Sequence, residues 1–218
     1  LIFNGTLDDA RIYNNVLTPG QIRQLATQVP AGLVLHLDMT GDATDVSGAG
    51  QNLVSNSGSA VPGRTGAANT AYRFTNGQII TISDRAELNP SMDASWTFWM
   101  KSPSISSLST EIFGKYTGSN GWIFKYDQFN YMHGWTYASS ATGAQTNSYP
   151  VPSDNVWNHY AFVRSGSTMT IYLNGASMSN VQAGNGLALL PGNVNLKFGN
   201  FGVGDLTAQD ARLYSRAL

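Results

Sequence analysis

The sequence predicts an all-β protein, an antiparallel sandwich of two sheets with one short helix near the N-terminus. Short runs of alternating apolar and polar residues recur along the chain. Turn residues, mostly Gly and Asn, separate these runs at roughly the 8–12-residue spacing of sandwich folds. In addition, the strand Asp-Ala-Arg-Ile-Tyr at 9–13 returns as Asp-Ala-Arg-Leu-Tyr at 210–214, so two copies of one strand lie near opposite ends.

Alternation places the individual strands. The predicted strands are 7–13, 32–37, 71–74, 78–82, 95–100, 111–116, 121–126, 129–137, 157–164, 168–173, 195–198 and 210–214. Asn76-Gly77 predicts a type I′ hairpin between the third and fourth of these. Thr18-Pro19-Gly20-Gln21 has the capping residues of the short helix. Residues 53–71 are rich in Ser, Gly, Ala and Asn, with Pro62-Gly63 as a turn, and no strand is assigned before residue 71.

Several side chains can be assigned to the core from the same pattern. The run 95–100 puts Trp96, Phe98 and Met100 on one face of a strand. Aromatic residues in a sandwich mostly fill its interior, so Trp96 and Trp157 are both expected in the core.

The composition narrows the function classes. The chain has 218 residues, of which 11% are charged, and a formal net charge of −1. Without a basic run it lacks the phosphate-neutralising charge of a nucleic-acid-binding protein. It has no cysteine and no apolar run near the ~18–20 residues of a membrane span. The neutral polar surface is typical of an extracellular protein or one on a cell or virion surface. The chain begins within a motif, and we expect it to be a segment of a longer polypeptide.

Six segments, in order, carry a resemblance to a known family. They are Gly32-Leu33-Val34 with Asp45-x-Ser47-Gly48, Tyr72-x-Phe74, Trp96-Thr97-Phe98-Trp99-Met100, Trp157-Asn158-His159-Tyr160, Ile171-Tyr172-Leu173-Asn174-Gly175, and Asp210 to Leu218. This order resembles the LamG-like jelly roll of the concanavalin A-like lectin and glucanase superfamily. The resemblance covers about residues 32–218 and implies a two-sheet jelly-roll sandwich.

The duplicated strand then sets the domain organisation. The jelly roll is expected at 32–218, after a linker at 29–31. Residues 5–25 resemble the end of such a domain, in which the closing strand is followed by a capped helix. Residues 1–28 are therefore either the C-terminal strand and helix of a preceding similar domain, or a strand that pairs with another sheet edge, in this molecule or a neighbour.

A calcium site is the first candidate for chemistry. Calcium takes six to eight oxygen ligands, and the loop 42–52 offers them at Asp42, Asp45, Ser47, Gln51 and Asn52. The resemblance implies a site built from this loop together with Asp210. The second copy of the repeat has one carboxylate fewer than the first, because Asp8-Asp9 of the first copy corresponds to Gln209-Asp210 of the second. The alternative is that Asp45 and Ser47 form local turns and that Asp210 pairs with Arg212. Zinc is not expected, since the three histidines are scattered.

Sugar binding is the second candidate. Lectins stack an aromatic ring on the apolar face of a sugar and surround it with polar donors. Trp122, Tyr126, Trp135 and Tyr137 lie in the middle strands, in a region rich in Asn and Ser. The alternative is that these rings fill the core.

Enzyme activity is not expected. Glycoside hydrolysis needs two carboxylates roughly 5–10 Å apart, and the chain has no Glu-x-Asp-x-x-Glu run of the kind its glucanase relatives carry. We therefore expect a noncatalytic recognition or adhesion module with a glycan or a surface protein as partner. The alternative is a structural repeat that assembles with neighbouring similar domains through the duplicated strand. A hydrolase relative without an evident acid pair is the third interpretation.

Overall fold

A computed structural model describes Val16 and residues 30–218, apart from 105–109, 127–130, 140, 147–148, 151, 153, 179–185 and 203. The chain divides into two units, Leu1–Pro30 and Ala31–Leu218. The predicted strand at 7–13, the helix that begins near Thr18 and both interpretations of residues 1–28 fall outside the described residues, so they stay predictions.

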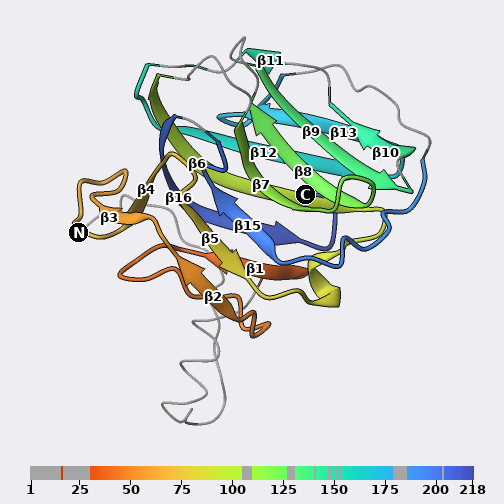
Figure 1. Cartoon of the computed structure of the whole chain (residues 1–218), viewed down its shortest axis with the longest axis horizontal. Helices are drawn as coiled ribbons and strands as arrows, with labels where there is room; N and C mark the ends of the chain where they lie inside the picture. The colour runs from red at the N-terminus through yellow and green to blue at the C-terminus, as the bar shows by residue number, and fades with distance from the viewer. Residues whose placement is uncertain are drawn as a thin grey trace. The chain divides into compact units, whose positions relative to one another are not determined.

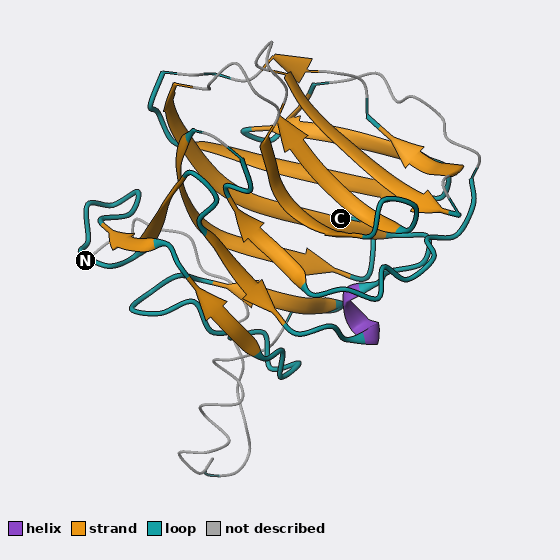
Figure 2. Ribbon diagram, in the orientation of Figure 1, coloured by secondary structure: helices purple, strands orange, loops and turns teal. Residues whose placement is uncertain are grey.

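The unit Ala31–Leu218 folds into two antiparallel sheets that face each other (Figures 1 and 2). Sheet I has the order β14-β13-β12-β6-β16-β4-β3, with β1 also paired to β16. Sheet II has the order β10-β9-β8-β7-β15-β5-β2, with β11 also paired to β9. This confirms the predicted all-β two-sheet sandwich. In the described part of the chain, no helix is long and apolar enough to cross a membrane.

The strands have the following bounds. Sheet I contains β1 (Leu33–Leu37), β3 (Ser59–Val61), β4 (Ala71–Thr75), β6 (Ala94–Ser104), β12 (Asn158–Ser165), β13 (Thr168–Leu173), β14 (Ala176–Ser177) and β16 (Asp205–Tyr214). Sheet II contains β2 (Leu53–Asn56), β5 (Ile79–Ile82), β7 (Thr110–Tyr116), β8 (Gly121–Tyr126), β9 (Tyr131–Ala138), β10 (Ala141–Gln145), β11 (Tyr149–Pro150) and β15 (Leu196–Gly199). One 3₁₀ turn, η1 (Ala86–Leu88), precedes β6.

The core lies between the sheets and is largely aromatic. Trp96 and Phe98 of β6 are fully buried, as predicted. The Phe98 ring lies 5.5 Å from that of Tyr160 in its own sheet and 5.8 Å from that of Phe198 in sheet II. Aromatic pairs at this spacing add to the stabilisation from burial alone, so these contacts hold the two sheets together.

Trp157 is not in this core, and its predicted assignment was wrong. Asn158, Tyr160 and Phe162 are the inward residues of β12. Side chains alternate across a strand, so Trp157 belongs to the outward series. It is half-buried there, and Lys101 Nζ lies 5.4 Å from the centre of its ring.

The Asn76-Gly77 turn forms, but the predicted hairpin does not. Both residues have positive φ, 29° and 81°, and Gln78 N donates to Thr75 O at 2.9 Å. The strand before it, β4, pairs with β16 and β3, whereas β5 pairs with β15 and β2. The turn therefore carries the chain from sheet I to sheet II.

The segment between residues 53 and 70, where no strand was predicted, contains two short strands, β2 and β3. Both are at sheet edges and show mostly exposed or half-buried residues. Without a buried face there is no apolar alternation to detect. The strand β10, at another sheet edge, was missed as well.

The second copy of the repeat, β16, is the central strand of sheet I, paired to β6 on one side and to β4 and β1 on the other. Ala211 and Leu213 are fully buried on its inward face. The register shifts between Gln209 and Arg212, and Asp210 has φ of 58°. This is a β-bulge, and it fixes where the Asp210 side chain points.

Candidate functional site

The four aromatic residues predicted to bind a sugar divide between the two faces of sheet II. Trp122 is 0% exposed and Tyr126 is 3% exposed, and both are core residues. Trp122 Nε1 donates to the Leu88 carbonyl at 2.9 Å. Neither ring has a free face, so their assignment to a ligand was wrong. Trp135 and Tyr137 belong to the outward series of β9 and are half-buried.

A shallow hollow of about 100 Å³ lies on this outward face. Its lining consists of Glu111, Gly114, Tyr116, Ile123, Val194, Asn195, Lys197 and Phe201. We call it the aromatic hollow. Gly114 pairs in register with Ile123 on one side and Lys197 on the other. Because Gly114 has no side chain, it leaves open space between Ile123 and Lys197 in the hollow.

A second glycine brings two tyrosines together beside the hollow. Gly121 of β8 lies in register between Tyr116 of β7 and Tyr137 of β9. With no side chain between them, the two rings approach to 4.9 Å at an interplanar angle of 34°. Gly121 has φ of 100°, and a Cβ there would come within 1.8 Å of the Lys115 carbonyl oxygen. Only glycine fits this position.

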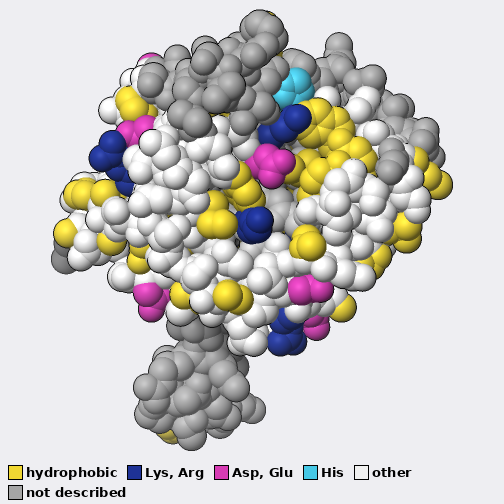
Figure 3. Space-filling model, in the orientation of Figure 1, with side chains coloured by type: hydrophobic (Ala, Val, Ile, Leu, Met, Phe, Trp, Pro, Cys, Tyr) yellow, Lys and Arg dark blue, Asp and Glu magenta, His cyan; other side chains and the backbone are white. Residues whose placement is uncertain are grey.

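Charged groups border the same rings. Glu111, Lys125 and His133 pair in register across β7, β8 and β9. His133 stacks on Trp135 with ring centres 5.0 Å apart at 10°, and Lys125 Nζ lies 5.0 Å from the Trp135 ring. Figure 3 views this face and shows hydrophobic side chains gathered over β8 and β9 beside cationic, acidic and histidine side chains.

Both tyrosine hydroxyls stay protonated at neutral pH. Burial, with a contribution from Tyr116, raises the pKa of Tyr137 to about 12. Burial, and then the charge of Glu111, also raises the pKa of Tyr116. The Tyr116 hydroxyl donates to the Gly118 carbonyl at 2.7 Å, so only its oxygen can accept from a ligand. The Tyr137 hydroxyl can donate a hydrogen bond to a ligand. Glu111 is the one carboxylate among the residues that line the hollow, so its lining does not supply the acid pair of a glycosidase.

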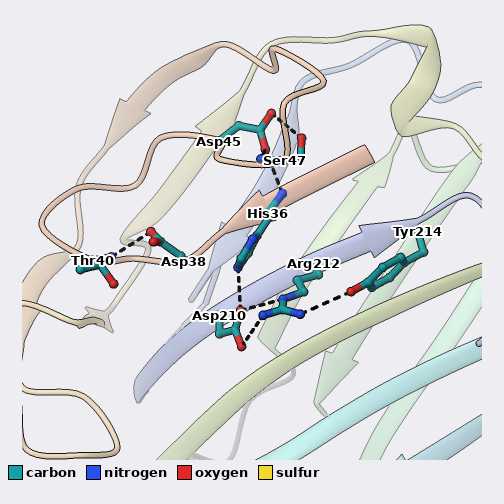
Figure 4. A network of polar contacts seen from close by, with 8 residues as sticks. All are labelled: His36, Asp38, Thr40, Asp45, Ser47, Asp210, Arg212 and Tyr214. Carbon is teal, nitrogen blue, oxygen red and sulfur yellow. Dashed lines mark hydrogen bonds and ion pairs between the residues drawn. The ribbon is translucent and has the colours of Figure 1, made fainter. Parts of the chain in front are cut away.

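The predicted metal ligands lie elsewhere, where β1 meets its neighbouring loop and β16 (Figure 4). Asp45 Oδ1 accepts hydrogen bonds from His36 N at 2.9 Å and Ser47 N at 3.0 Å. Its Oδ2 accepts from Ser47 Oγ at 2.8 Å and Gln51 N at 3.0 Å. A carboxylate has about four acceptor positions, and here four protein donors fill them.

Asp210 is held by the His36 imidazole and the Arg212 guanidinium. Its Oδ1 lies 2.8 Å from His36 Nε2 and accepts from Arg212 Nε at 2.8 Å, while Oδ2 accepts from Arg212 Nη2 at 3.2 Å. Burial raises the pKa of Asp210, but the His36 hydrogen bond and the Arg212 charge outweigh it and hold the pKa below its ordinary value. Figure 4 shows Asp45 at the backbone end of His36 and Asp210 at its ring end.

This arrangement does not fit a calcium site built from Asp45, Ser47 and Asp210. The oxygens that would bind the ion already accept protein hydrogen bonds, and Arg212 is beside the carboxylate that the ion would need. Asp42 and Asn52 are exposed, and Asp42 Oδ1 accepts from Thr44 N and Oγ1 within its own turn. Within residues 30–218 as described, no three His, Asp or Glu side chains cluster so as to hold a metal ion. Calcium binding stays a prediction.

Comparison with known proteins agrees with the fold. Residues 74–218 match the concanavalin A-like lectin/glucanases superfamily. The chain belongs to this superfamily. No curated protein sequence matches it.

Solved structures with the same fold include toxin binding domains. The binding domain of Paraclostridial Mosquitocidal Protein 1 has a TM-score of 0.73 at 18% identity, with 86% of this chain and 49% of that chain covered. The binding domain of botulinum neurotoxin serotype C1 has a TM-score of 0.67 at 13% identity, with 86% and 49% covered. At these identities the likeness shows the fold alone, and the chain spans about half the length of each.

Proposed function

We propose that this chain is a noncatalytic recognition module that binds a glycan at the aromatic hollow of sheet II. One observation carries the proposal. Gly121 leaves room for the Tyr116 and Tyr137 rings to come together on an outward sheet face, on the same strand face as the half-buried Trp135. A face of partly exposed rings with fixed polar groups suits the apolar face and hydroxyls of a sugar.

The polar groups around the rings complete the fit. The Tyr137 hydroxyl donates, the Tyr116 hydroxyl oxygen and the Glu111 carboxylate accept, and Asn195 can do both. A site with both kinds of group pairs with sugar hydroxyls, which also donate and accept. The lack of a second lining carboxylate supports binding without hydrolysis.

The structural relatives support the same class of partner. Structures of botulinum neurotoxin binding domains describe interaction with two ganglioside molecules, a complex with SialylT and a complex with rat synaptotagmin II. Those ligands belong to proteins of which this chain spans about half. They support a glycan as the partner, and a location outside the cell or on a surface.

The test is a glycan array probed with residues 1–218, followed by calorimetry on the best glycan. Trp135→Ala and Tyr137→Ala are each expected to weaken binding by about tenfold or more, because each removes an aromatic face. Trp157→Ala is the matched control, since this half-buried tryptophan is on sheet I and should leave the affinity within about twofold. An array without binders, or equal losses from Trp135→Ala and Trp157→Ala, would contradict the proposal.

A further inference from the structure

A larger cleft lies on the outward face of sheet I, away from the aromatic hollow. Its volume is about 450 Å³, and it is lined by Val61, Pro62, Arg73, Lys101, Pro103, Asn155, Asp205 and Thr207. Small-molecule sites have volumes of roughly 300–1,000 Å³, so this cleft has room for a ligand of one or two sugar rings. None of its residues contributes to the proposed glycan site.

The floor of the cleft is a row of side chains on three adjacent strands. Thr207 of β16 pairs in register with Arg73 of β4 on one side and Lys101 of β6 on the other. Arg73 is held by Asp205, with Nε at 2.9 and 3.1 Å from its two oxygens and Nη2 at 2.5 Å from Oδ2. This bidentate pair leaves Arg73 with a neutralising partner.

Lys101 is held differently. It forms no ion pair with any described residue, and its Nζ lies over the Trp157 ring, 5.4 Å from the centre. A cation over an indole is attracted to the ring face but keeps its charge and hydrogen-bonding capacity. Asp154 precedes the cleft residue Asn155 in the sequence. Its side chain is exposed and accepts a hydrogen bond from Val156 N at 3.1 Å.

A second cation of this kind, Arg64, lies over Trp99 of β6. The Arg64 guanidinium carbon is 3.9 Å from the Trp99 ring centre, and Trp99 is two residues before Lys101 on the same outward face. The outward face of sheet I therefore presents two cations that are positioned by tryptophans instead of carboxylates. An anionic ligand would find a positive charge already in place, which lowers the cost of ordering the site.

We propose that the cleft binds a sugar acid, a monosaccharide-sized ligand with a carboxylate group. The carboxylate pairs with Lys101, which supplies the charge that the cleft leaves uncompensated. Ring hydroxyls bond to Asn155 and to the free lone pairs of Asp205. The apolar walls of Val61, Pro62 and Pro103 cover the C–H face of the ring. With the aromatic hollow on the other sheet, the module would hold two different glycan groups at once.

Calorimetry and amide NMR shifts with sodium glucuronate test this, with glucose and sodium acetate at the same ionic strength as reference ligands. Glucuronate is expected to bind and to shift the amides of Arg73, Lys101 and Thr207, while glucose binds at least about tenfold more weakly. Lys101→Met keeps a linear side chain, one heavy atom shorter, and removes its charge, so it should weaken glucuronate binding by about tenfold or more. Lys101→Arg should retain it.

Lys197→Met, in the aromatic hollow, is the matched control and should leave glucuronate binding unchanged. Lys101→Met should also leave intact the affinity for a neutral glycan at the hollow, so this proposal and the proposed function can fail separately. Equal binding of glucose and glucuronate would overturn the inference, as would equal binding of acetate, unaltered glucuronate affinity in Lys101→Met, or shifts confined to sheet II.

Discussion

Replacing Asp45 with alanine is expected to lower the stability of the domain whether or not calcium is present. The carboxylate accepts four hydrogen bonds, two of which reach outside its own turn to His36 N and Gln51 N. A hydrogen bond to a buried charged group contributes about 1.5–3 kcal/mol. Asp45 is half-buried, so we discount each bond to about 0.8 kcal/mol.

The four bonds then amount to about 3 kcal/mol at this discounted value. For a domain of this length, 1 kcal/mol shifts the melting temperature by about 2–4 °C. Asp45→Ala should therefore melt about 6–12 °C lower than the parent chain. Asp45→Asn, which keeps one acceptor oxygen and loses the other, should lose about half as much.

The assay is thermal unfolding of residues 1–218 in excess calcium and in chelator. Asp42→Ala is the matched control, because this loop aspartate is exposed and accepts only from Thr44, and its shift should be small. A ligand that binds the folded state raises the melting temperature by mass action. If Asp45→Ala lowered the melting temperature in calcium but not in chelator, the carboxylate would be a metal ligand and the reasoning would be refuted.

Three further outcomes follow from buried or constrained groups. Arg164→Met should cost about 2–4 kcal/mol in chemical denaturation, because its fully buried guanidinium donates to Gly166 O at 2.9 Å and across the sandwich to Thr136 Oγ1 at 3.0 Å. Gly121→Ala should cost about 3 kcal/mol or more by the same measurement, since a Cβ would meet the Lys115 carbonyl. Because the folded-state pKa of Asp210 lies below its ordinary 3.8, its stabilising contribution is complete above that value and is lost as the pH falls through the folded pKa. The acid side of a melting-temperature profile should therefore be flatter in Asp210→Asn.

Each of these outcomes can fail on its own. Arg164→Met with unchanged stability would mean that the cost of burying the charge equals the value of its hydrogen bonds. A stable Gly121→Ala would show that β8 can shift away from β7. If the melting temperature fell equally at acid pH in Asp210→Asn and in the parent chain, the fall would be due to other carboxylates.

The fold could be predicted from the sequence because its central strands bury one face. Apolar residues alternate in parts of β6, β12 and β16, and β12 was placed to within one residue at each end. The prediction for β6 ended four residues early, and that for β16 missed its first five residues. The edge strands β2 and β3 bury little and left no such pattern. Asn76-Gly77 predicted its own backbone shape but not its partners, since a turn dipeptide specifies φ and ψ and leaves pairing to the sheets.

The candidate site could be predicted only in part, for a related reason. The aromatic run in β8 and β9 pointed to the strands that border the aromatic hollow. Which rings face outward depends on which alternate residues of each strand point away from the core. In the structure, Trp135 and Tyr137 point outward, whereas Trp122 and Tyr126 are in the core. The lining residues Val194, Lys197 and Phe201 come from segments far along the chain, so local patterns could not bring them to the hollow. The cleft on sheet I was missed because its row Arg73, Thr207 and Lys101 exists only through strand pairing.

The residues around Asp210 show how a sequence difference between the two copies of the repeat changes the role that its acidic residues can have. The first copy of the repeat has Asp8-Asp9, whereas the second has Gln209-Asp210. Gln209 Oε1 accepts from Arg64 N at 3.1 Å, so this side chain ties down a loop. The remaining carboxylate, Asp210, is at a bulge and receives positive charge from Arg212 and a hydrogen bond from His36. A carboxylate in this setting needs a compensating cation, and the protein supplies it from its own side chains. A bound ion is therefore not required to hold β1 against β16, which is the physical reason to expect the same stability in calcium and in chelator.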